Sequence, residues 1–333
     1  MFRKRGEILN TVKLGNTDLF VTPLCLGTIK YGTGLPEEDS IRQLYEYTEL
    51  GGNFLDTAHI YGDWQPGWGP KSEITIGKWI KERGKRDDIV ISTKGAHPNI
   101  QTMNIPRLGD AQILEDLEDS LKSLQTDYVD LYFLHRDDER RPVEEIVEFL
   151  ESQVRAGKIR YYGCSNWRTE RIAAANTYAK AHGLQGFSCN QLMWSLAQVN
   201  PDGIPDKTLV MMDGKTYDYH AEEKLAAMAY MSAAKGYFSK RIGGCELSQS
   251  VKNIYDLPAN DEIYKILRDA VSEGSGSCTA MDYALRFLME GHPFASAAIA
   301  SFSSPEQLRE GMHALKAPVD PEVMERLRAC RKL

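Results

Sequence analysis

Four side chains whose types suit proton transfer to a carbonyl oxygen follow short apolar segments: Asp56, Tyr61, Lys94 and His135. Asp56 and Lys94 are 38 residues apart, and Lys94 and His135 are 41 apart, about one strand-plus-helix unit each time. A free tyrosine has a pKa of roughly 10. A lysine ammonium beside the phenol lowers that pKa toward working pH, where a general acid is most effective. The set therefore predicts acid–base chemistry at a carbonyl group.

Each of the four side chains has an expected role. Tyr61 is the general acid in reduction and the base in oxidation, and Lys94 lowers its pKa. Asp56 holds and polarises Lys94, while His135 hydrogen-bonds the substrate carbonyl and orients it. A competing use of Lys94 is as a Schiff-base nucleophile, as in barrel aldolases. The neighbouring carboxylate disfavours that use, because a salt-bridged ammonium is a poor amine nucleophile.

The elements that must position these residues alternate regularly along the chain. Eight strand-like segments alternate with segments whose apolar residues recur at helical spacing. Such alternation predicts parallel strands, and eight units predict a closed barrel whose chemistry lies at the carboxyl ends of the strands. The strand candidates are 24–28, 53–57, 89–94, 129–135, 159–164, 186–190, 226–230 and 297–300, and the helix candidates are 38–50, 74–83, 111–124, 143–156, 170–182 and 278–290.

Two further features complete the predicted architecture. Alternating apolar positions around a turn with Gly and Asn predict a β-hairpin over 12–21. The connections 192–222 and 239–260 have little periodicity, and loops of that length are usually functional or mobile. We therefore expect one α/β domain over 1–333: a (β/α)8 TIM barrel with an N-terminal β-hairpin and long loops over its C-terminal face.

Composition excludes several classes of protein. The chain has 333 residues, 42% of them hydrophobic, with a net charge of −7 and no Lys/Arg block, which argues against nucleic-acid binding. Six scattered cysteines without a Cys-x-x-Cys pair indicate thiols in a reducing compartment. The charged segment 1–7 lacks the apolar stretch of a signal peptide, and the apolar run 294–302 is too short to span a bilayer. We expect a cytoplasmic protein without membrane association, as a monomer or a homo-oligomer.

Two barrel hydrolase classes also fit poorly. The seven histidines include no His-x-His and no His-Glu-x-x-His pattern, so no metal site is expected. A glycoside hydrolase would need two carboxylates at strand ends, whereas the fourth strand candidate ends in His135.

Six segments resemble, in order and spacing, those of the aldo-keto reductase superfamily: 54–62, 71–79, 92–94, 130–135, 163–167 and 190–191. The resemblance covers nearly the whole chain and implies a barrel enzyme that reduces an aldehyde or ketone with a nicotinamide cofactor, using Asp56, Tyr61, Lys94 and His135. Two segments, 94–97 and 135–138, look most like a bacterial subset associated with sugar-like ketones. A second implied alternative is a non-catalytic relative that binds the dinucleotide as a redox-sensing interaction subunit.

Hydride transfer requires a cofactor, and the chain has no Rossmann-type glycine fingerprint. The resemblance instead implies a dinucleotide bound across the barrel mouth, with NADP (as NADPH) expected and NAD as the alternative. The implied cofactor-binding residues are Gly27, Thr28, Asp56, Ser165, Asn166, Gln191, Tyr230, Lys235, Gly236, Phe238, Lys240, Ser301, Ser303, Gln307 and Glu310.

Within that set the resemblance assigns separate tasks. Ser165, Asn166 and Gln191 hold the nicotinamide carboxamide, and Tyr230 stacks on its ring. The segment 235–240 grips the pyrophosphate. Each task has a structural alternative. The three polar side chains could instead satisfy the backbone of loops, Tyr230 could be a core residue, and the lysines of 235–240 could be solvated.

The segment after the eighth strand candidate is expected to hold the adenosine 2′-phosphate. Ser304-Pro305 suits a helix N-cap with proline in the first turn, whose free N–H groups suit a phosphate. Relatives often carry Arg or Lys where this chain has Ser303, and an asparagine where it has Gly311. Without that cation we expect only a modest preference for NADPH, on the order of tenfold, increased by Ser303→Arg. A much larger preference would point to another cation, with Lys240 and Arg241 as the first suspects.

Residues just past the strand ends are candidates for substrate binding. Trp64 and Trp68 follow Tyr61, and a further set follows other strand candidates. Indoles mixed with polar donors suit a polyhydroxylated or sugar-like carbonyl compound, and the alternative is aromatic packing on neighbouring helices. The substrate candidates are Trp64, His97, Arg136 and Trp167.

Overall fold

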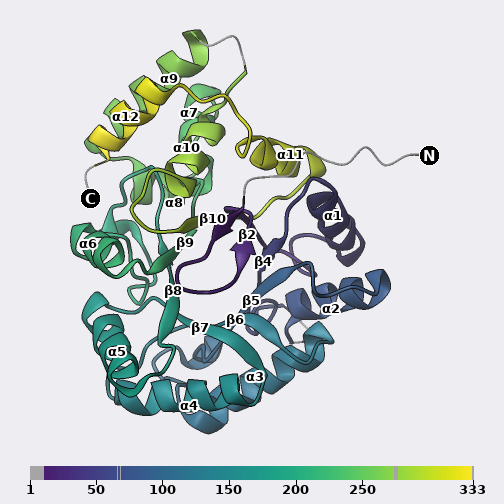
Figure 1. Ribbon diagram of the computed structural model, residues 1–333. Coiled ribbons are helices and arrows are strands. Elements are labelled where there is room, and N and C mark those ends of the chain that lie inside the picture. Colours follow the sequence, from purple (N-terminus) through teal and green to yellow (C-terminus); the bar gives the residue numbers. More distant parts are fainter. Residues whose placement is uncertain (1–10, 66, 68, 274–276, 332–333) are drawn as a thin grey trace.

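The computed structural model describes residues 11–65, 67, 69–273 and 277–331; the segment 1–7 and Trp68, considered above, lie outside them. Eight parallel strands form a closed barrel in which each strand pairs with the next in sequence and the last closes onto the first (Figure 1). This confirms the predicted (β/α)8 architecture. The strands are β3 (Leu24–Gly27), β4 (Phe54–Asp56), β5 (Val90–Gly95), β6 (Val129–Leu134), β7 (Ile159–Ser165), β8 (Phe187–Met193), β9 (Ala226–Tyr230) and β10 (Ser296–Ala300).

The predicted hairpin is also confirmed. Strands β1 (Val12–Lys13) and β2 (Phe20–Val21) pair antiparallel. Leu14, Leu19 and Val21 are buried in one cluster with residues of the barrel interior. Gly15 has φ +56°, and a Cβ there would lie 3.0 Å from the carbonyl oxygen of Ser188. The hairpin therefore closes the end of the barrel opposite the carboxyl ends of the strands.

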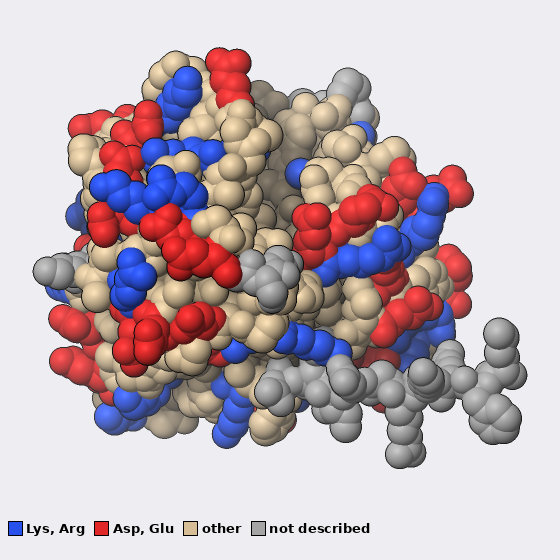
Figure 2. Space-filling view, turned by 90° about the horizontal axis from the view of Figure 1, so that it is seen from above, with Lys and Arg blue, Asp and Glu red and all other residues tan. Residues whose placement is uncertain are grey.

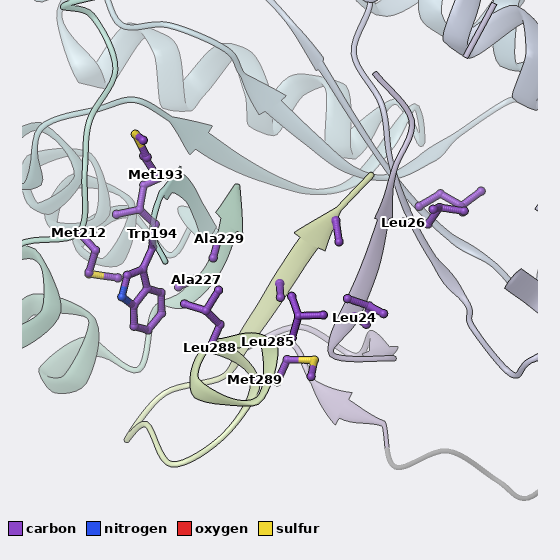
Figure 3. Packing of buried hydrophobic residues seen from close by; sticks show 14 of the residues in the cluster. Leu24, Leu26, Met193, Trp194, Met212, Ala227, Ala229, Leu285, Leu288 and Met289 are labelled. Carbon is purple, nitrogen blue, oxygen red and sulfur yellow. The ribbon is translucent and has the colours of Figure 1, made fainter. Parts of the chain in front are cut away.

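The six predicted helices all form, with small shifts at their ends, and they surround the barrel (Figure 1). On α10, for example, Leu285, Leu288 and Met289 are buried in the hydrophobic core between this helix and the barrel strands (Figure 3). These helices are α1 (Glu37–Glu49), α2 (Lys71–Arg83), α3 (Asp110–Leu124), α4 (Val143–Arg155), α5 (Thr169–His182) and α10 (Ala280–Met289).

The two long connections contain more structure than the sequence indicated. The connection over 239–260 has little sequence periodicity, yet a short helix at Gln249–Tyr255 buries Val251, Ile254 and Tyr255. Short helices are marginal alone and are stabilised by tertiary packing, so their sequence pattern is weak. The further helices are α6 (Gly214–Glu223), α7 (Tyr237–Ile242), α8 (Gln249–Tyr255), α9 (Pro258–Glu273), α11 (Pro305–His313) and α12 (Pro321–Cys330), with 3₁₀ turns η1 (Ile100–Thr102), η2 (Pro201–Gly203) and η3 (Ala234–Gly236).

Charged side chains of both signs are mixed on the surface. On the face that Figure 2 shows, Lys and Arg are interspersed with Asp and Glu, and neither sign covers the face. In the part of the chain that the structure describes, every helix is too short or too polar to cross a lipid bilayer.

A buried carboxyl group lies between α2 and the barrel. Glu73 is fully buried, and the hydroxyl of Thr93 on β5 donates to its Oε1 at 2.5 Å. Burial raises the pKa of Glu73 to about 7, although His59 and the hydroxyl partners oppose the rise. The carboxyl is therefore neutral in the folded protein at pH values where it is ionised in the unfolded chain.

We expect Glu73→Gln to remove a pH dependence of stability. The pKa of Glu73 is higher in the folded protein than in the unfolded chain. The contribution of this carboxyl to the free energy of unfolding is therefore fully present below about pH 4.5 and is lost as the pH rises toward 7. Between pH 4.5 and pH 8, the free energy of unfolding of wild type should therefore fall relative to that of the variant by on the order of 2–3 kcal/mol. Urea denaturation of both proteins at several pH values measures this gain. Parallel pH profiles for the two proteins would contradict the prediction.

Candidate active site

The structure brings three of the four predicted catalytic residues into direct contact at the carboxyl ends of β4 and β5. Lys94 Nζ donates to Asp56 Oδ2 at 2.7 Å, to the carbonyl oxygen of Thr57 at 2.6 Å and to Tyr61 Oη at 3.2 Å. Both members of the ion pair are buried. All three hydrogens of the ammonium therefore have acceptors, and the phenol is one of them.

The carboxylate of the pair is held from its other side. Asp56 Oδ1 accepts from Ser92 Oγ at 2.7 Å and from Gln191 Nε2 at 2.8 Å. Ser92 lies on β5, and Gln191 lies across the barrel on β8. Two donors from different strands fix Asp56 in one orientation, and Asp56 in turn fixes Lys94.

Burial and charge set the protonation of the phenol and the ammonium. Burial raises the pKa of Tyr61 above its usual value of 10, and the nearby Lys94 cation only partly offsets this. Burial lowers the pKa of Lys94, but the charges and hydrogen bonds of Asp56 and Tyr61 together outweigh burial, so that the pKa is raised. At neutral pH the site therefore holds a protonated phenol beside an ammonium, whereas the sequence had suggested a net lowering of the tyrosine pKa.

His135 lies just past β6 and faces the same site. Its ring centroid is 6.2 Å from that of Tyr61 and 4.7 Å from that of His97. Burial lowers its pKa well below 6.5, assisted by coupling to the His97 ring and by the cations Arg136 and Lys94, so the imidazole is neutral. Its Nδ1 is buried and has no hydrogen-bond partner among the described atoms. The ring itself lines the same cavity as the phenol.

Asp56, Tyr61 and His135 line a cavity of about 670 Å³. Its volume is within the usual range for small-molecule and cofactor sites. All predicted cofactor-binding residues line it except Phe238, which is buried in α7 against Tyr237. The lining members of that set are Gly27, Thr28, Asp56, Ser165, Asn166, Gln191, Tyr230, Lys235, Gly236, Lys240, Ser301, Ser303, Gln307 and Glu310.

A connected polar group lies beside the Tyr61 end of the cavity. Tyr230 Oη donates to Asn166 Oδ1 at 2.6 Å, and Asn166 Nδ2 donates to Ser165 Oγ at 3.0 Å. Asn166 has φ +61°, a left-handed conformation that is uncommon outside glycine. Such strain persists where the surroundings enforce it, and it is enriched at functional sites. The group therefore presents fixed amide and hydroxyl dipoles to a ligand.

A comparison with known protein families gives a match over most of the chain. The Aldo/keto reductase family matches residues 23–332. This chain belongs to the aldo/keto reductase family. The resemblance that the sequence motifs indicated is thereby confirmed.

Individual relatives of this aldo/keto reductase include bacterial and fungal proteins. It is 37% identical over 193 residues to the uncharacterized oxidoreductase YrpG of Bacillus subtilis, covering 56% of this chain and 58% of that protein. It is 35% identical over 196 residues to a norsolorinic acid reductase of Aspergillus flavus, covering 53% and 47%. The match to norsolorinic acid reductase B of Aspergillus parasiticus is 28% identical over 291 residues, covering 82% and 72%. The matched part of the chain spans about half the length of the first two relatives.

The predicted substrate residues of this aldo/keto reductase fall into different environments. Trp64 is 45% exposed, with its ring centroid 6.3 Å from that of Tyr61. His97 packs on His135 and lines a smaller neighbouring cavity of about 140 Å³. Arg136 lines the main cavity, with its guanidinium bound by Asp206 at 3.0 Å. Trp167 is only 1% exposed and packs on the Phe187 ring, as in the alternative of simple aromatic packing.

Several lining residues of this aldo/keto reductase were missed from the sequence. Lys30 lines the cavity from the β3–α1 loop, and its Nζ donates to Ser303 Oγ at 2.5 Å. Phe302 also lines it, and a Cβ at Gly311 would lie 2.3 Å from the Phe302 ring, so a side chain at 311 has no room. Lys30 closely follows Gly27 and Thr28, which were predicted to bind the cofactor, and this proximity in sequence could have indicated that it lines the cavity.

No group of three metal-binding side chains occurs among the residues that the structure describes.

Proposed function

We propose that this chain is an NADP(H)-dependent oxidoreductase that reduces an aldehyde or ketone to an alcohol, with Tyr61 as the general acid. One observation carries the proposal. A protonated phenol, a carboxylate and a neutral imidazole line one cofactor-sized cavity, and the Lys94 ammonium contacts the phenol and the carboxylate from behind that lining. This is the set of groups that proton delivery to a carbonyl oxygen requires.

The chain's own residues account for the proton. Tyr61 Oη holds it at neutral pH, because burial keeps the pKa of the phenol above 10. Lys94 donates to that oxygen and stabilises the phenolate as the proton leaves. His135, which is neutral and lines the cavity, hydrogen-bonds the carbonyl oxygen and orients it toward Tyr61. In oxidation the same groups act in reverse.

The cavity lining suits a nicotinamide dinucleotide phosphate, which when bound supplies the hydride. Lys30, Lys235 and Lys240 all line the cavity, and among the described residues none of them is in a salt bridge. An anionic ligand would balance this charge. Ser165 and Asn166 would bind the nicotinamide carboxamide, and Tyr230 would stack on the nicotinamide ring. The lining thus combines these lysine cations with neutral amide and hydroxyl groups.

The substrate side of the site favours an aromatic or otherwise flat carbonyl compound as much as a sugar-like one. Trp64 offers an exposed indole beside Tyr61, but Trp167 is buried and Arg136 is already bound by Asp206. Two relatives carry the names norsolorinic acid reductase and aryl-alcohol dehydrogenase. We therefore include aryl aldehydes and aryl ketones beside sugar-like ketones in the proposed substrate range.

The main test follows the absorbance of NADPH in both directions. Aryl aldehydes, aryl ketones and sugar-like ketones are tested with NADPH, and sugar alcohols are tested with NADP⁺. Turnover of at least one class supports the reductase. Tight binding of NADPH with no turnover across the panel would favour the non-catalytic redox-sensing subunit instead. Failure to bind any nicotinamide dinucleotide would reject both.

A separate experiment tests the Schiff-base use of Lys94. Because all three ammonium hydrogens are bound and the pKa of Lys94 is raised, we expect borohydride with an aldehyde or ketone to trap no adduct on this residue. Peptide mass spectrometry after reduction is the measurement, with exposed lysines such as Lys78 reporting non-specific labelling. A reduced imine on Lys94 would overturn the reductase mechanism.

A further inference from the structure

Lys30 is a cavity-lining cation that lies far in sequence from the predicted phosphate-binding segment. It is in the loop between β3 and α1, two residues after Thr28. The carbonyl oxygen of Lys30 accepts from the backbone N–H groups of Thr33 at 3.1 Å and Leu35 at 2.8 Å. The next residue, Tyr31, is buried, and its hydroxyl donates to Gln43 Oε1 on α1 at 3.0 Å. A tightly bonded turn therefore presents the Lys30 side chain.

The Lys30 ammonium reaches the segment that begins α11. Its Nζ donates to Ser303 Oγ at 2.5 Å, and both residues line the cavity together with Gln307 and Glu310. The contact joins parts of the chain that are 273 residues apart. Ser303 occupies the position where a cation was expected from the resemblance. In the structure, a residue that follows β3 therefore places a positive charge beside the segment that follows β10.

This charge is available to a ligand. Among the described residues, Lys30 has no carboxylate partner, and its ammonium donates to the neutral hydroxyl of Ser303. Arg241, one of the two cations first suspected, is instead bound by Asp261 at 3.0 Å and by the Tyr237 hydroxyl at 2.7 Å. An ammonium that contacts a hydroxyl can exchange it for a phosphate oxygen without first losing a salt bridge.

The helix terminus beside Lys30 adds little by itself. In α11, Pro305 at the first position has no N–H, and the N–H of Gln307 already donates to Ser304 Oγ at 3.3 Å. The N–H of Ser303 donates to Gln307 Oε1 at 2.9 Å. With these donors engaged, the lysine is the principal source of positive charge for an anion bound at this end.

We propose that Lys30 binds the ribose monophosphate that distinguishes NADPH from NADH and thereby sets cofactor preference in this protein. The proposal rests on the proposed function. It replaces the expectation of a modest preference, which assumed that no cation reaches Ser303. A charge-assisted contact to a phosphate that is lost on substitution corresponds to about 10- to 100-fold in affinity.

The test measures binding rather than turnover. Dissociation constants of NADPH, NADH, adenosine 2′,5′-bisphosphate and adenosine 5′-monophosphate are determined by calorimetry for wild type, Lys30→Met and Lys30→Arg. We expect Lys30→Met to weaken NADPH and the bisphosphate by about 10- to 100-fold and to change NADH and the monophosphate by less than about twofold. Lys30→Arg should restore most of the loss, because the charge is kept.

Lys235→Met serves as the matched control. Lys235 lines the same cavity from η3, so its loss should weaken NADPH and NADH by similar factors and leave their ratio unchanged. Thermal unfolding checks that each variant is folded, which we expect because Lys30 is partly exposed.

The outcomes separate this proposal from the proposed function. If wild type binds NADPH without turning over any carbonyl compound, and Lys30→Met still weakens NADPH selectively, the role of Lys30 is supported although the catalytic proposal fails. Equal effects of Lys30→Met on NADPH and NADH, or no effect on either, would overturn the role of Lys30 alone. Wild type that binds neither dinucleotide overturns both.

Discussion

Tyr61→Phe is expected to lower kcat by at least 10²–10⁴-fold while changing the affinity for NADPH by less than about twofold. The substitution keeps the ring and removes only the hydroxyl that Lys94 Nζ contacts at 3.2 Å. Loss of one general acid accounts for the lower bound, and a cooperating set of residues gives more. Steady-state rates with the best carbonyl substrate and fluorescence titration with NADPH give the two quantities.

A matched variant controls for the loss of a tyrosine hydroxyl in general. Tyr45 lies on α1, away from the cavity, and its hydroxyl donates to Glu82 Oε1 at 3.0 Å. Tyr45→Phe should leave kcat unchanged. A Tyr61→Phe enzyme with wild-type kcat would rule out Tyr61 as the acid. In the wild type, because burial holds the pKa of Tyr61 above 10, the acid form should persist through neutral pH and be lost only in the alkaline range.

Lys94→Met should affect both turnover and stability. The substitution leaves Asp56 buried without its cation, and breaking a buried pair from one side costs about 3–5 kcal/mol. The folded pKa of Lys94 is raised, so its contribution to stability is fully present below the unfolded value near 10.5 and is lost only as the pH rises through the folded value. The full loss should therefore be visible at pH 7 by urea denaturation.

A double-mutant cycle separates the two effects of Lys94. Adding Asp56→Asn to Lys94→Met removes the unpaired charge, so it should recover a large part of the lost stability without recovering kcat. If the double variant were as unstable as the sum of the single variants, the two residues would not be coupled as their 2.7 Å contact implies. Recovery of turnover in the double variant would contradict the role of Lys94 in catalysis.

The barrel and the three-residue contact could be predicted from the sequence because their signals are local. Each strand is a short apolar run and each outer helix carries its own apolar periodicity, so the alternation is visible without knowledge of tertiary contacts. Parallel strands bring their carboxyl ends to one face, and this rule alone places Asp56, Lys94 and His135 together. The predicted contact of Lys94 with Asp56 and Tyr61 follows from that topology.

Other features depended on contacts that the sequence does not display. Helices α7 and α8 have six and seven residues and form where packing supports them, so the segment looked irregular. Trp167 and Phe238 had the right residue types and approximate positions, but burial against neighbours excludes both from the cavity. The pKa of Tyr61 could not be judged either, because the burial that outweighs Lys94 arises from the assembled site.

The sequence by itself determined the barrel, the family and the residues that meet at the proposed proton-transfer site. Only the tertiary structure decided where positive charge meets the proposed phosphate. In the sequence, Ser303 and Gly311 stood where relatives often carry a cation and an asparagine. In the fold, Lys30 contacts Ser303 and the Phe302 ring fills the space beside Gly311. Closure of β10 onto β3 brings the two ends of the barrel sequence together, and no local pattern records that contact.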